Sequence, residues 1–202
     1  MIRERQERSD KKCPAAPYIS DSSYEQIARI GYVCDLPLKA VGELLAREGL
    51  KSKDLIDVIK LNFRRDFIVD DYQICIGHQE NRPFRMNFTG DKKRLAMRFY
   101  KFEHERFAAL AYALDCSVQM AIGYVIETSL TRKNILLTVL GKGIIRELNQ
   151  SRIEQLREIC RFLDQRSPDV YITLPVVMAH ILNSSLIDQK KITKTIAEWT
   201  HT

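Results

Sequence analysis

The chain has 202 residues and a mass of 23.5 kDa, which is one large or two small domains at roughly 100 to 200 residues per domain. Hydrophobic residues make up 45% and charged residues 29%, so a sizeable core can form, and both a disordered chain and an elaborate multidomain enzyme are excluded. The formal net charge is +6, and residues 82–106 alone carry eight basic and three acidic side chains. Most of the excess positive charge therefore lies in one segment.

The sequence contains no run of about 18 consecutive apolar residues, and its first residues are charged where a signal peptide has an apolar centre. Its five cysteines are dispersed and odd in number, which does not fit a closed disulfide framework. We therefore expect a cytoplasmic protein that has no membrane partner.

The N-terminal part divides into two segments. Residues 1–21 mix charged and polar residues without apolar periodicity, which predicts a mobile arm. Residues 22–90 predict a three-helix unit with a β-hairpin: helices begin at Ser22, Leu38 and Ser52, and the hairpin covers residues 72–90.

The segment 91–133 begins with a strand in which apolar side chains alternate with others from Leu95 to Tyr100. A helix follows and ends near Asp115, and Ser117 is a typical N-cap for the next helix. Residues 134–202 predict a C-terminal helical region. The expected fold is mainly α, with a short β-ribbon.

The segment 94–130 resembles the ribbon-helix-helix family of DNA-binding proteins. The resemblance rests on a six-residue alternating strand with basic residues, on a first helix that ends in Leu110–Cys116, and on Ser117 at the start of the second helix. Family members usually have glycine where Asp115 stands here, but aspartate tolerates the left-handed backbone better than most residues.

The resemblance implies a two-stranded antiparallel ribbon that enters the major groove of DNA. Because one strand leaves its backbone unpaired, two copies of the chain are expected to pair, with a shared dimer core. The residues assigned to that core are Leu95, Met97 and Phe99. The residues expected to contact bases are Arg94, Ala96 and Arg98, since arginine suits guanine and alanine suits the thymine methyl group.

Phosphate contacts are expected on both sides of this strand. Lys92 and Lys93 precede it, and each phosphate that is neutralised adds about −0.9 to the slope of log affinity against log salt. In the family the start of the second helix touches the backbone through its free amide groups, a place taken here by Ser117 and Val118. These contacts position the protein without specifying sequence.

Two alternatives concern residues 22–90. The stretch 44–52, with Gly49 in the turn, looks like a second helix-turn-helix junction, which would allow a tandem repeat and an intrachain ribbon. In outline the same region is also similar to a winged helix, in which residues 52–65 would be the recognition helix. Whether this region binds DNA stays open.

No catalytic residues are assigned. Cys75 and His78 form a CxxH pair, but a second pair of metal ligands is missing nearby, and the motifs of nucleotide-binding and hydrolytic enzymes are absent from the sequence. We therefore predict a protein that is not an enzyme and has no metal and no cofactor.

The preferred hypothesis is a ribbon-helix-helix core flanked by an N-terminal helical unit and a C-terminal helical bundle. It acts as a homodimer or higher oligomer that binds double-stranded DNA sequence-specifically, as a transcriptional repressor or as a factor in plasmid or mobile-element maintenance or transfer. The C-terminal helices would extend the dimer or bind a protein partner. The alternative is a helical adaptor protein that does not bind nucleic acid.

Overall fold

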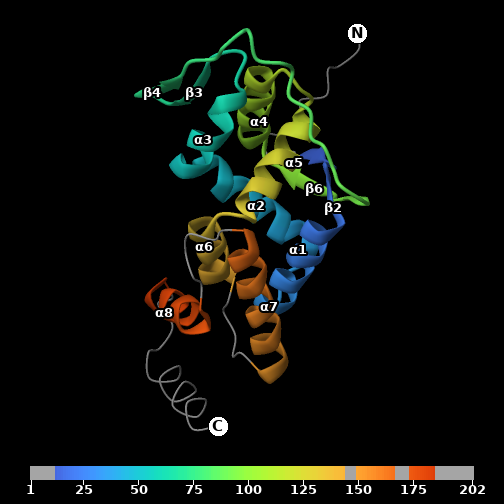
Figure 1. Ribbon diagram of the computed structural model, residues 1–202, viewed down its shortest axis with the longest axis vertical. Coiled ribbons are helices and arrows are strands. Elements are labelled where there is room, and N and C mark those ends of the chain that lie inside the picture. Colours follow the sequence, from blue (N-terminus) through green and yellow to red (C-terminus); the bar gives the residue numbers. More distant parts are fainter. Residues whose placement is uncertain (1–11, 144–148, 167–172, 185–202) are drawn as a thin grey trace, which may run out of the picture.

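The computed structural model describes residues 12–143, 149–166 and 173–184. This part of the chain is mainly helical, with eight α-helices and short antiparallel pairs of strands (Figure 1). Two segments of it have the same order of elements, two short strands followed by two helices.

The first of these units consists of β1 (Cys13–Ala15), β2 (Tyr18–Ser20), α1 (Asp21–Cys34) and α2 (Leu38–Lys51). Ser20 caps α1, because its side-chain oxygen accepts a hydrogen bond from the Ser23 N–H at 3.2 Å. Asp35 ends α1 in the left-handed conformation, with φ of 56°, and Pro37 precedes α2. The helix–helix turn is therefore very short.

The second unit consists of β5 (Lys92–Arg94), β6 (Met97–Phe99), α4 (Lys101–Leu114) and α5 (Val118–Ser129). Asp115 adopts the predicted left-handed conformation, with φ of 53°, and Ser117 caps α5 by accepting from the Met120 N–H at 3.2 Å. The turn and the helix start predicted for this segment are confirmed, whereas the strand predicted from Leu95 to Tyr100 is present as two short strands, β5 and β6, separated by residues 95–96.

The strands of the two units pair with each other. Cys13 lies opposite Phe99, Tyr18 opposite Arg94, and Ser20 opposite Lys92, all in one antiparallel register. Pro17 has no N–H to donate, so the ladder is interrupted there, although the Pro17 carbonyl accepts the Leu95 N–H at 3.0 Å. We call this paired structure, residues 13–20 with 92–99, the ribbon.

The ribbon corrects two predictions. A second copy of the chain is not needed to pair the strand at 94–100, because residues 13–20 of the same chain do so. The prediction of a mobile arm is wrong for residues 13–21, which form β1, β2 and the start of α1; residues 1–11 lie outside the described part.

Beneath the ribbon, α2 and α5 cross closely. A Cβ atom at Gly49 would lie 2.8 Å from Val125 Cγ1 and would also collide with Ser129 Oγ, so a larger residue requires these side chains to shift. Ser129 Oγ in turn donates to the Leu45 carbonyl at 3.2 Å. The two units thus share one hydrophobic core.

Corresponding residues of the two units are separated by 80 positions throughout. Asp35 matches Asp115 at the left-handed turn, Ala16 matches Ala96 in the ribbon, and Gly49 matches Ser129 at the helix crossing. The predicted second junction at residues 44–52 is therefore wrong as a repeat. Gly49 lies inside α2, and the equivalent turn is at Asp35.

The segment between the units contains a short helix, a 3₁₀ turn and a β-hairpin: α3 (Lys53–Ile59), η1 (Lys60–Asn62), β3 (Phe67–Asp70) and β4 (Gln73–Cys75). The hairpin was expected at residues 72–90, but it begins five residues earlier, and residues 76–91 form no strand. In Figure 1 it projects from the upper end of the molecule.

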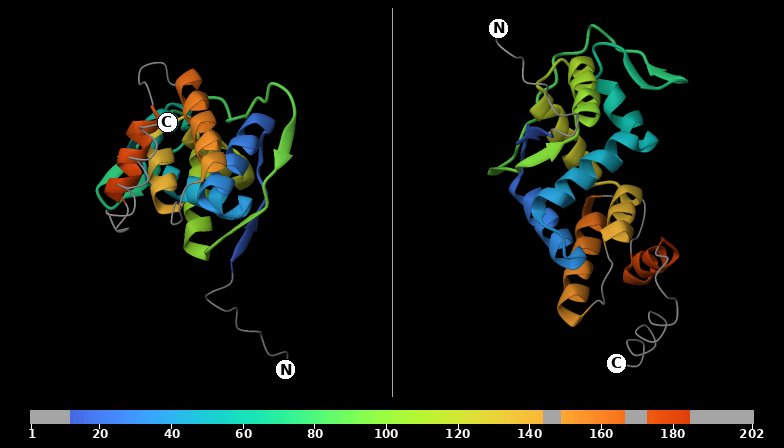
Figure 2. Two further views of the ribbon diagram at one scale, coloured as in Figure 1. Left: turned by 90° about the horizontal axis from the view of Figure 1, so that it is seen from below. Right: turned by 180° about the vertical axis from the view of Figure 1, so that it is seen from behind.

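The C-terminal region adds α6 (Lys133–Gly143), α7 (Gln150–Arg166) and α8 (Leu174–Ser184). α7 packs on α1, α6 on α2, and α8 on α6, which places these helices at the end of the molecule away from the β3–β4 hairpin (Figures 1 and 2). The predicted helical character is confirmed for the described part; residues 144–148, 167–172 and 185–202 lie outside it.

Within the described ranges no single helix is long and apolar enough to cross a membrane. Only α4 and α5 together reach that length and composition, as a pair bent by 94°.

Candidate nucleic-acid interface

The outer face of the ribbon is formed by the side chains that point away from the core. Arg94, Ala96 and Arg98, the predicted base contacts, are all exposed and lie on one side of their strand because side chains alternate. From the other strand Pro14 lies opposite Arg98, and Tyr18 lies opposite Arg94. The structure therefore brings the three predicted residues together in one row.

The charges of the two outward arginines are not neutralised within the described residues. Neither Arg94 nor Arg98 forms an ion pair with a carboxylate of the described residues. The Arg94 guanidinium lies 4.9 Å from the ring centroid of Tyr18, a cation–π contact that restricts its motion. Two positive charges thus face solvent from the ribbon.

The inner face of the same strand is fully covered. Leu95 and Met97 are 3% exposed and Phe99 is 0% exposed, and they pack with Ala15 and Ile19 of the opposite strand. The residues assigned to a dimer core are therefore buried as a set, but the core belongs to a single chain.

Lys92 and Lys93 were expected to precede the strand, but both lie within β5, opposite Ser20 and Ile19, and they differ in their surroundings. Lys92 is exposed, and its ammonium lies 4.9 Å from the Tyr18 ring at the edge of the outer face. Lys93 turns to the other side, where it is paired with the Asp21 carboxylate, which raises the pKa of Lys93. Lys12, from the segment predicted to be a mobile arm, matches Lys92 and lies 4.5 Å from the Tyr100 ring. Lys12 and Lys92 are both exposed and lie at matching positions along the ribbon.

The helices α2 and α5 begin beside the ribbon. Ser117 is exposed and Val118 is half-buried, so the first turn of α5 is accessible at the place where a phosphate contact is predicted. The first N–H groups of any helix lack partners within the helix and attract anions. The matching turn of α2 carries an exposed cation, Lys39.

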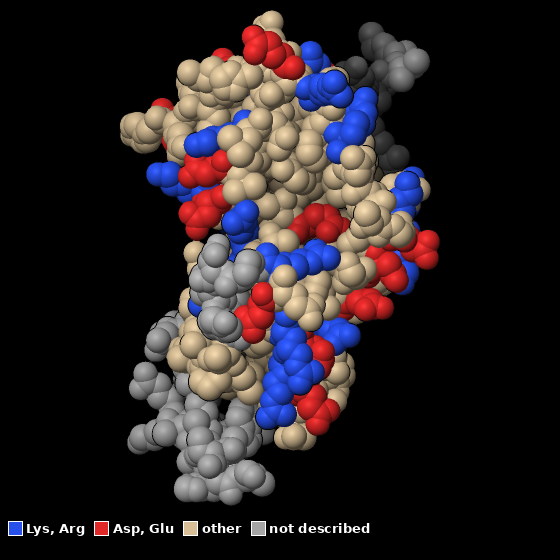
Figure 3. All heavy atoms as spheres, viewed as in Figure 1, with Lys and Arg blue, Asp and Glu red and all other residues tan. Residues whose placement is uncertain are grey.

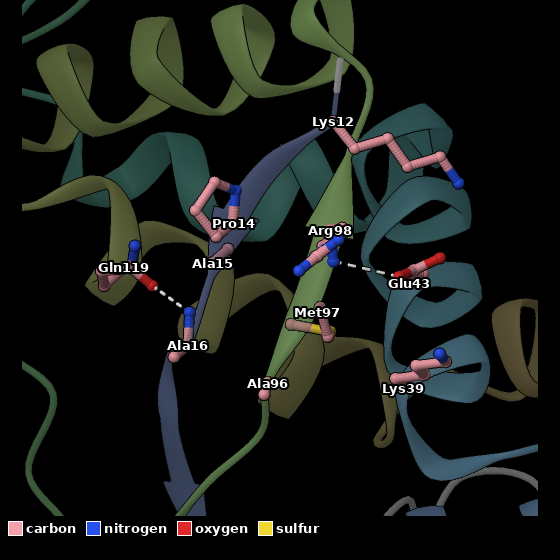
Figure 4. Close-up of a pocket in the computed structure, with 10 residues that line it drawn as sticks. All are labelled: Lys12, Pro14, Ala15, Ala16, Lys39, Glu43, Ala96, Met97, Arg98 and Gln119. Atoms are coloured by element: carbon pink, nitrogen blue, oxygen red, sulfur yellow. Dashed lines mark hydrogen bonds between the residues drawn. The ribbon is translucent and has the colours of Figure 1, made fainter. Parts of the chain in front are cut away.

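Side chains from these helices fix the ribbon backbone. Gln119 Oε1 accepts the Ala16 N–H at 2.6 Å, and Glu43 Oε1 accepts the Arg98 N–H at 3.0 Å. Around these contacts lies a shallow hollow of about 820 Å³, shown in Figure 4, with Lys12 and Lys39 on its α2 side. The helices thus hold the ribbon in position from both sides.

Positive side chains follow the ribbon edge in the surface view. Figure 3 shows Lys and Arg along the right-hand edge, where Figure 1 places the ribbon, with acidic side chains below them. Of the cations in residues 82–106, Lys92, Arg94 and Arg98 belong to the ribbon and are exposed.

The cations of the predicted recognition helix at 52–65 are largely neutralised within the chain. Lys60 is paired with Asp57, while Arg64 and Arg65 are both paired with Asp115. The bond from Arg65, with that from Arg64, holds the pKa of Asp115 below its ordinary value. The aspartate at this left-handed turn thus has a second role, since its carboxylate binds residues 64–65 to the turn between α4 and α5.

Of the CxxH pair, Cys75 is the last residue of β4, and His78 follows the hairpin. Cys75 is buried, and burial raises the pKa of its thiol, while the His78 backbone N–H donates to the Phe63 carbonyl at 2.8 Å. In the part of the chain that the structure describes, no group of three or more His, Cys, Asp or Glu side chains is placed to hold a metal ion.

Sequence reasoning missed the contribution of residues 12–20 to this surface. Their alternation of buried Ala15, Pro17 and Ile19 with outward Pro14 and Tyr18 is the signal, but two prolines in eight residues argue against a strand. The aspartates at 35 and 115, at matching helix ends, are the second signal that was missed.

Comparison of the chain with protein-family models, curated proteins and solved structures gave no match.

Proposed function

We propose that this protein binds double-stranded DNA sequence-specifically and that it is a ribbon-helix-helix protein in which both units belong to one chain. The observation that carries the proposal is the outward row Arg94, Ala96 and Arg98 on a two-stranded antiparallel ribbon. A two-stranded ribbon has the dimensions of the major groove, where each base pair presents its own pattern of donors and acceptors.

The row supplies the chemistry that base recognition needs. An arginine guanidinium donates two hydrogen bonds to O6 and N7 of guanine, and a small apolar residue such as Ala96 leaves room for a thymine methyl group. The arginines have no carboxylate partner among the described residues, so binding DNA does not require an internal ion pair to break.

Phosphate contacts are assigned to the edges of the ribbon. Lys12 and Lys92 lie at matching positions, Lys12 just before β1 and Lys92 as the first residue of β5, and the exposed starts of α2 and α5 follow on either side. Lys93 is a weaker candidate than the sequence suggested, since its charge is bound to Asp21. These contacts place the ribbon in the groove and make affinity depend on salt.

A protein of this kind acts by occupying its site. We assign it to transcriptional repression or to plasmid or mobile-element maintenance or transfer, because all of these use the same contacts. Association of several copies along neighbouring sites and a protein partner for α6, α7 and α8 belong to the same proposal.

The test is selection of bound duplexes from a random library at about 150 mM salt, followed by fluorescence anisotropy on the enriched duplex. Arg98→Ala should weaken binding to that duplex by about 1 to 3 kcal/mol and leave the melting temperature unchanged. The matched control is Lys53→Ala, which removes the same charge from α3, where a winged helix would contact DNA.

An unchanged affinity for Arg98→Ala would remove the ribbon from the interface, and a loss confined to Lys53→Ala would assign recognition to α3. A folded protein that enriches no duplex would contradict DNA binding altogether.

One observation favours the adaptor alternative as a second function. Ile68 and Ile74, which are paired across the hairpin, are 68% and 62% exposed, and Ile76 just after β4 is 73% exposed. Exposed β-branched apolar side chains of this kind are typical of a protein contact. A pull-down with wild type and with an Ile68→Thr, Ile74→Thr variant tests it, and a partner retained equally by both would argue against the hairpin.

A further inference from the structure

The two strands of the ribbon share a backbone arrangement but differ in the chemistry of their outer faces. We propose that the protein recognises a non-palindromic DNA site, that one chain occupies one site, and that the strand of residues 92–99 makes the base-specific contacts. This inference rests on the proposed function and adds the class of DNA sequence that it selects.

The backbone frame is close to twofold symmetric. Residues 16 and 96 are equivalent, and both are alanine at the centre of the ribbon. The helix turns at Asp35 and Asp115 have φ values of 56° and 53°, and the flanking lysines at 12 and 92 are likewise equivalent. Both the fold and the phosphate contacts are therefore arranged about one pseudo-twofold axis.

The outer side chains break this symmetry. The position equivalent to Arg94 is Pro14, and the position equivalent to Arg98 is Tyr18. Both guanidinium groups on the face thus come from one strand, while the other strand presents a proline ring and a phenol. Neither proline nor tyrosine can form the paired donor contact that arginine makes with guanine.

This difference decides the symmetry of the target. In a homodimer each base contact occurs twice, related by the twofold axis, and the preferred site is palindromic for that reason. Here one half of the ribbon has two guanine-binding side chains and the other half has none. The free energy of recognition therefore depends on the orientation of the DNA sequence. The symmetric lysines contact the phosphates of the DNA in both orientations.

The spacing along the strand predicts the layout of the site. Arg94 and Arg98 are four residues apart, about 13 Å at a rise of about 3.3 Å per residue. Base pairs are stacked at about 3.4 Å, so the two arginines are suited to guanines about four base pairs apart. Ala96 and Ala16 lie between them and suit A·T pairs, whose thymine methyl groups need space.

The ends of the face are also unequal. At one end Arg94 and Lys92 both lie 4.9 Å from the Tyr18 ring, which forms a cluster of two cations around one aromatic side chain. At the other end Arg98 lies opposite Pro14 and has only its backbone N–H fixed, by Glu43 at 3.0 Å. We therefore expect stricter base selection at the Arg94 end.

The experiment is duplex selection with four proteins, wild type and three variants, and each variant is first checked for an unchanged melting temperature and circular dichroism spectrum. Wild type should enrich a motif of about five base pairs that is not its own inverted complement, and mass photometry should show one chain per motif. Arg94→Ala and Arg98→Ala should each lose base preference at one end, with affinity for the wild-type motif reduced about 5- to 150-fold.

A variant with the same outer side chains on both strands gives the strongest test. Pro14→Arg with Tyr18→Arg copies the outer face of residues 94–98 onto the other strand, and it should shift the selected motif toward an inverted repeat. An inverted repeat already selected by wild type would overturn this inference and leave the proposed function in place. No enriched motif for any of the folded proteins would overturn the proposed function, and this inference with it.

Discussion

The crossing of α2 and α5 offers a test of how the two units are joined. Gly49→Ala adds a Cβ atom that would lie 2.8 Å from Val125 Cγ1 and against Ser129 Oγ. Alanine is favoured over glycine inside a helix by about 1 kcal/mol, so a site without contacts would be stabilised. Because of these contacts, we expect Gly49→Ala to destabilise the protein.

The magnitude follows from three terms. Crowding a packed core costs about 1 to 3 kcal/mol, and a Ser129 side chain that turns away loses its hydrogen bond to the Leu45 carbonyl, worth about 1 kcal/mol. Set against the gain in helix propensity, Gly49→Ala should lower the free energy of unfolding by about 1 to 3 kcal/mol. Urea titration followed by circular dichroism at 222 nm measures this change.

A double-mutant cycle then shows whether the two helices meet at this point. Ser129→Gly removes the hydroxyl, so Gly49→Ala should cost at least about 1 kcal/mol less in that background. Ala109→Gly, on the exposed side of α4, is the matched control and should leave the cost unchanged. Additivity within about 0.5 kcal/mol for Gly49→Ala with Ser129→Gly would refute the close crossing.

Two further predictions concern the ribbon and the second helix turn. Phe99→Ala empties a fully buried position next to the Phe107 ring and should cost about 3 to 5 kcal/mol by urea unfolding; a cost below about 1 kcal/mol would mean that the strand is not packed on the core. Arg65 and Arg64 depress the pKa of Asp115 in the folded state, so this carboxylate stabilises the fold above its unfolded pKa of about 3.9, and the contribution is lost as pH falls through the folded value. Asp115→Asn should therefore flatten the fall in melting temperature below about pH 4, and an identical slope in both proteins would contradict the ion pairs.

Much of the second unit was predictable because its signals are local. The alternation of Leu95, Met97 and Phe99, the left-handed turn at Asp115 and the cap at Ser117 all depend on neighbours within a few residues, and the structure confirms each of them. The outward placement of Arg94 and Arg98 follows from the same alternation.

The first unit was only half predicted, for a physical reason. Its helices are visible as apolar stripes, but its strand contains Pro14 and Pro17, and neither residue can donate to a ladder. The strand forms because Ile19 and Ala15 are buried against the other unit and because Gln119 accepts the Ala16 N–H. None of these stabilising contacts is local.

By itself, the sequence determined the helices, the left-handed turn at Asp115 and the row of basic residues on one strand. Each of these features depends only on residues a few positions apart in the chain. Only the tertiary structure decided which strand completes the ribbon. Residues 13–20 and 92–99 are about 80 positions apart, and no local pattern specifies a pairing across that distance. The shared core selects that partner, because pairing within one chain buries Phe99 and Ile19 without a second molecule.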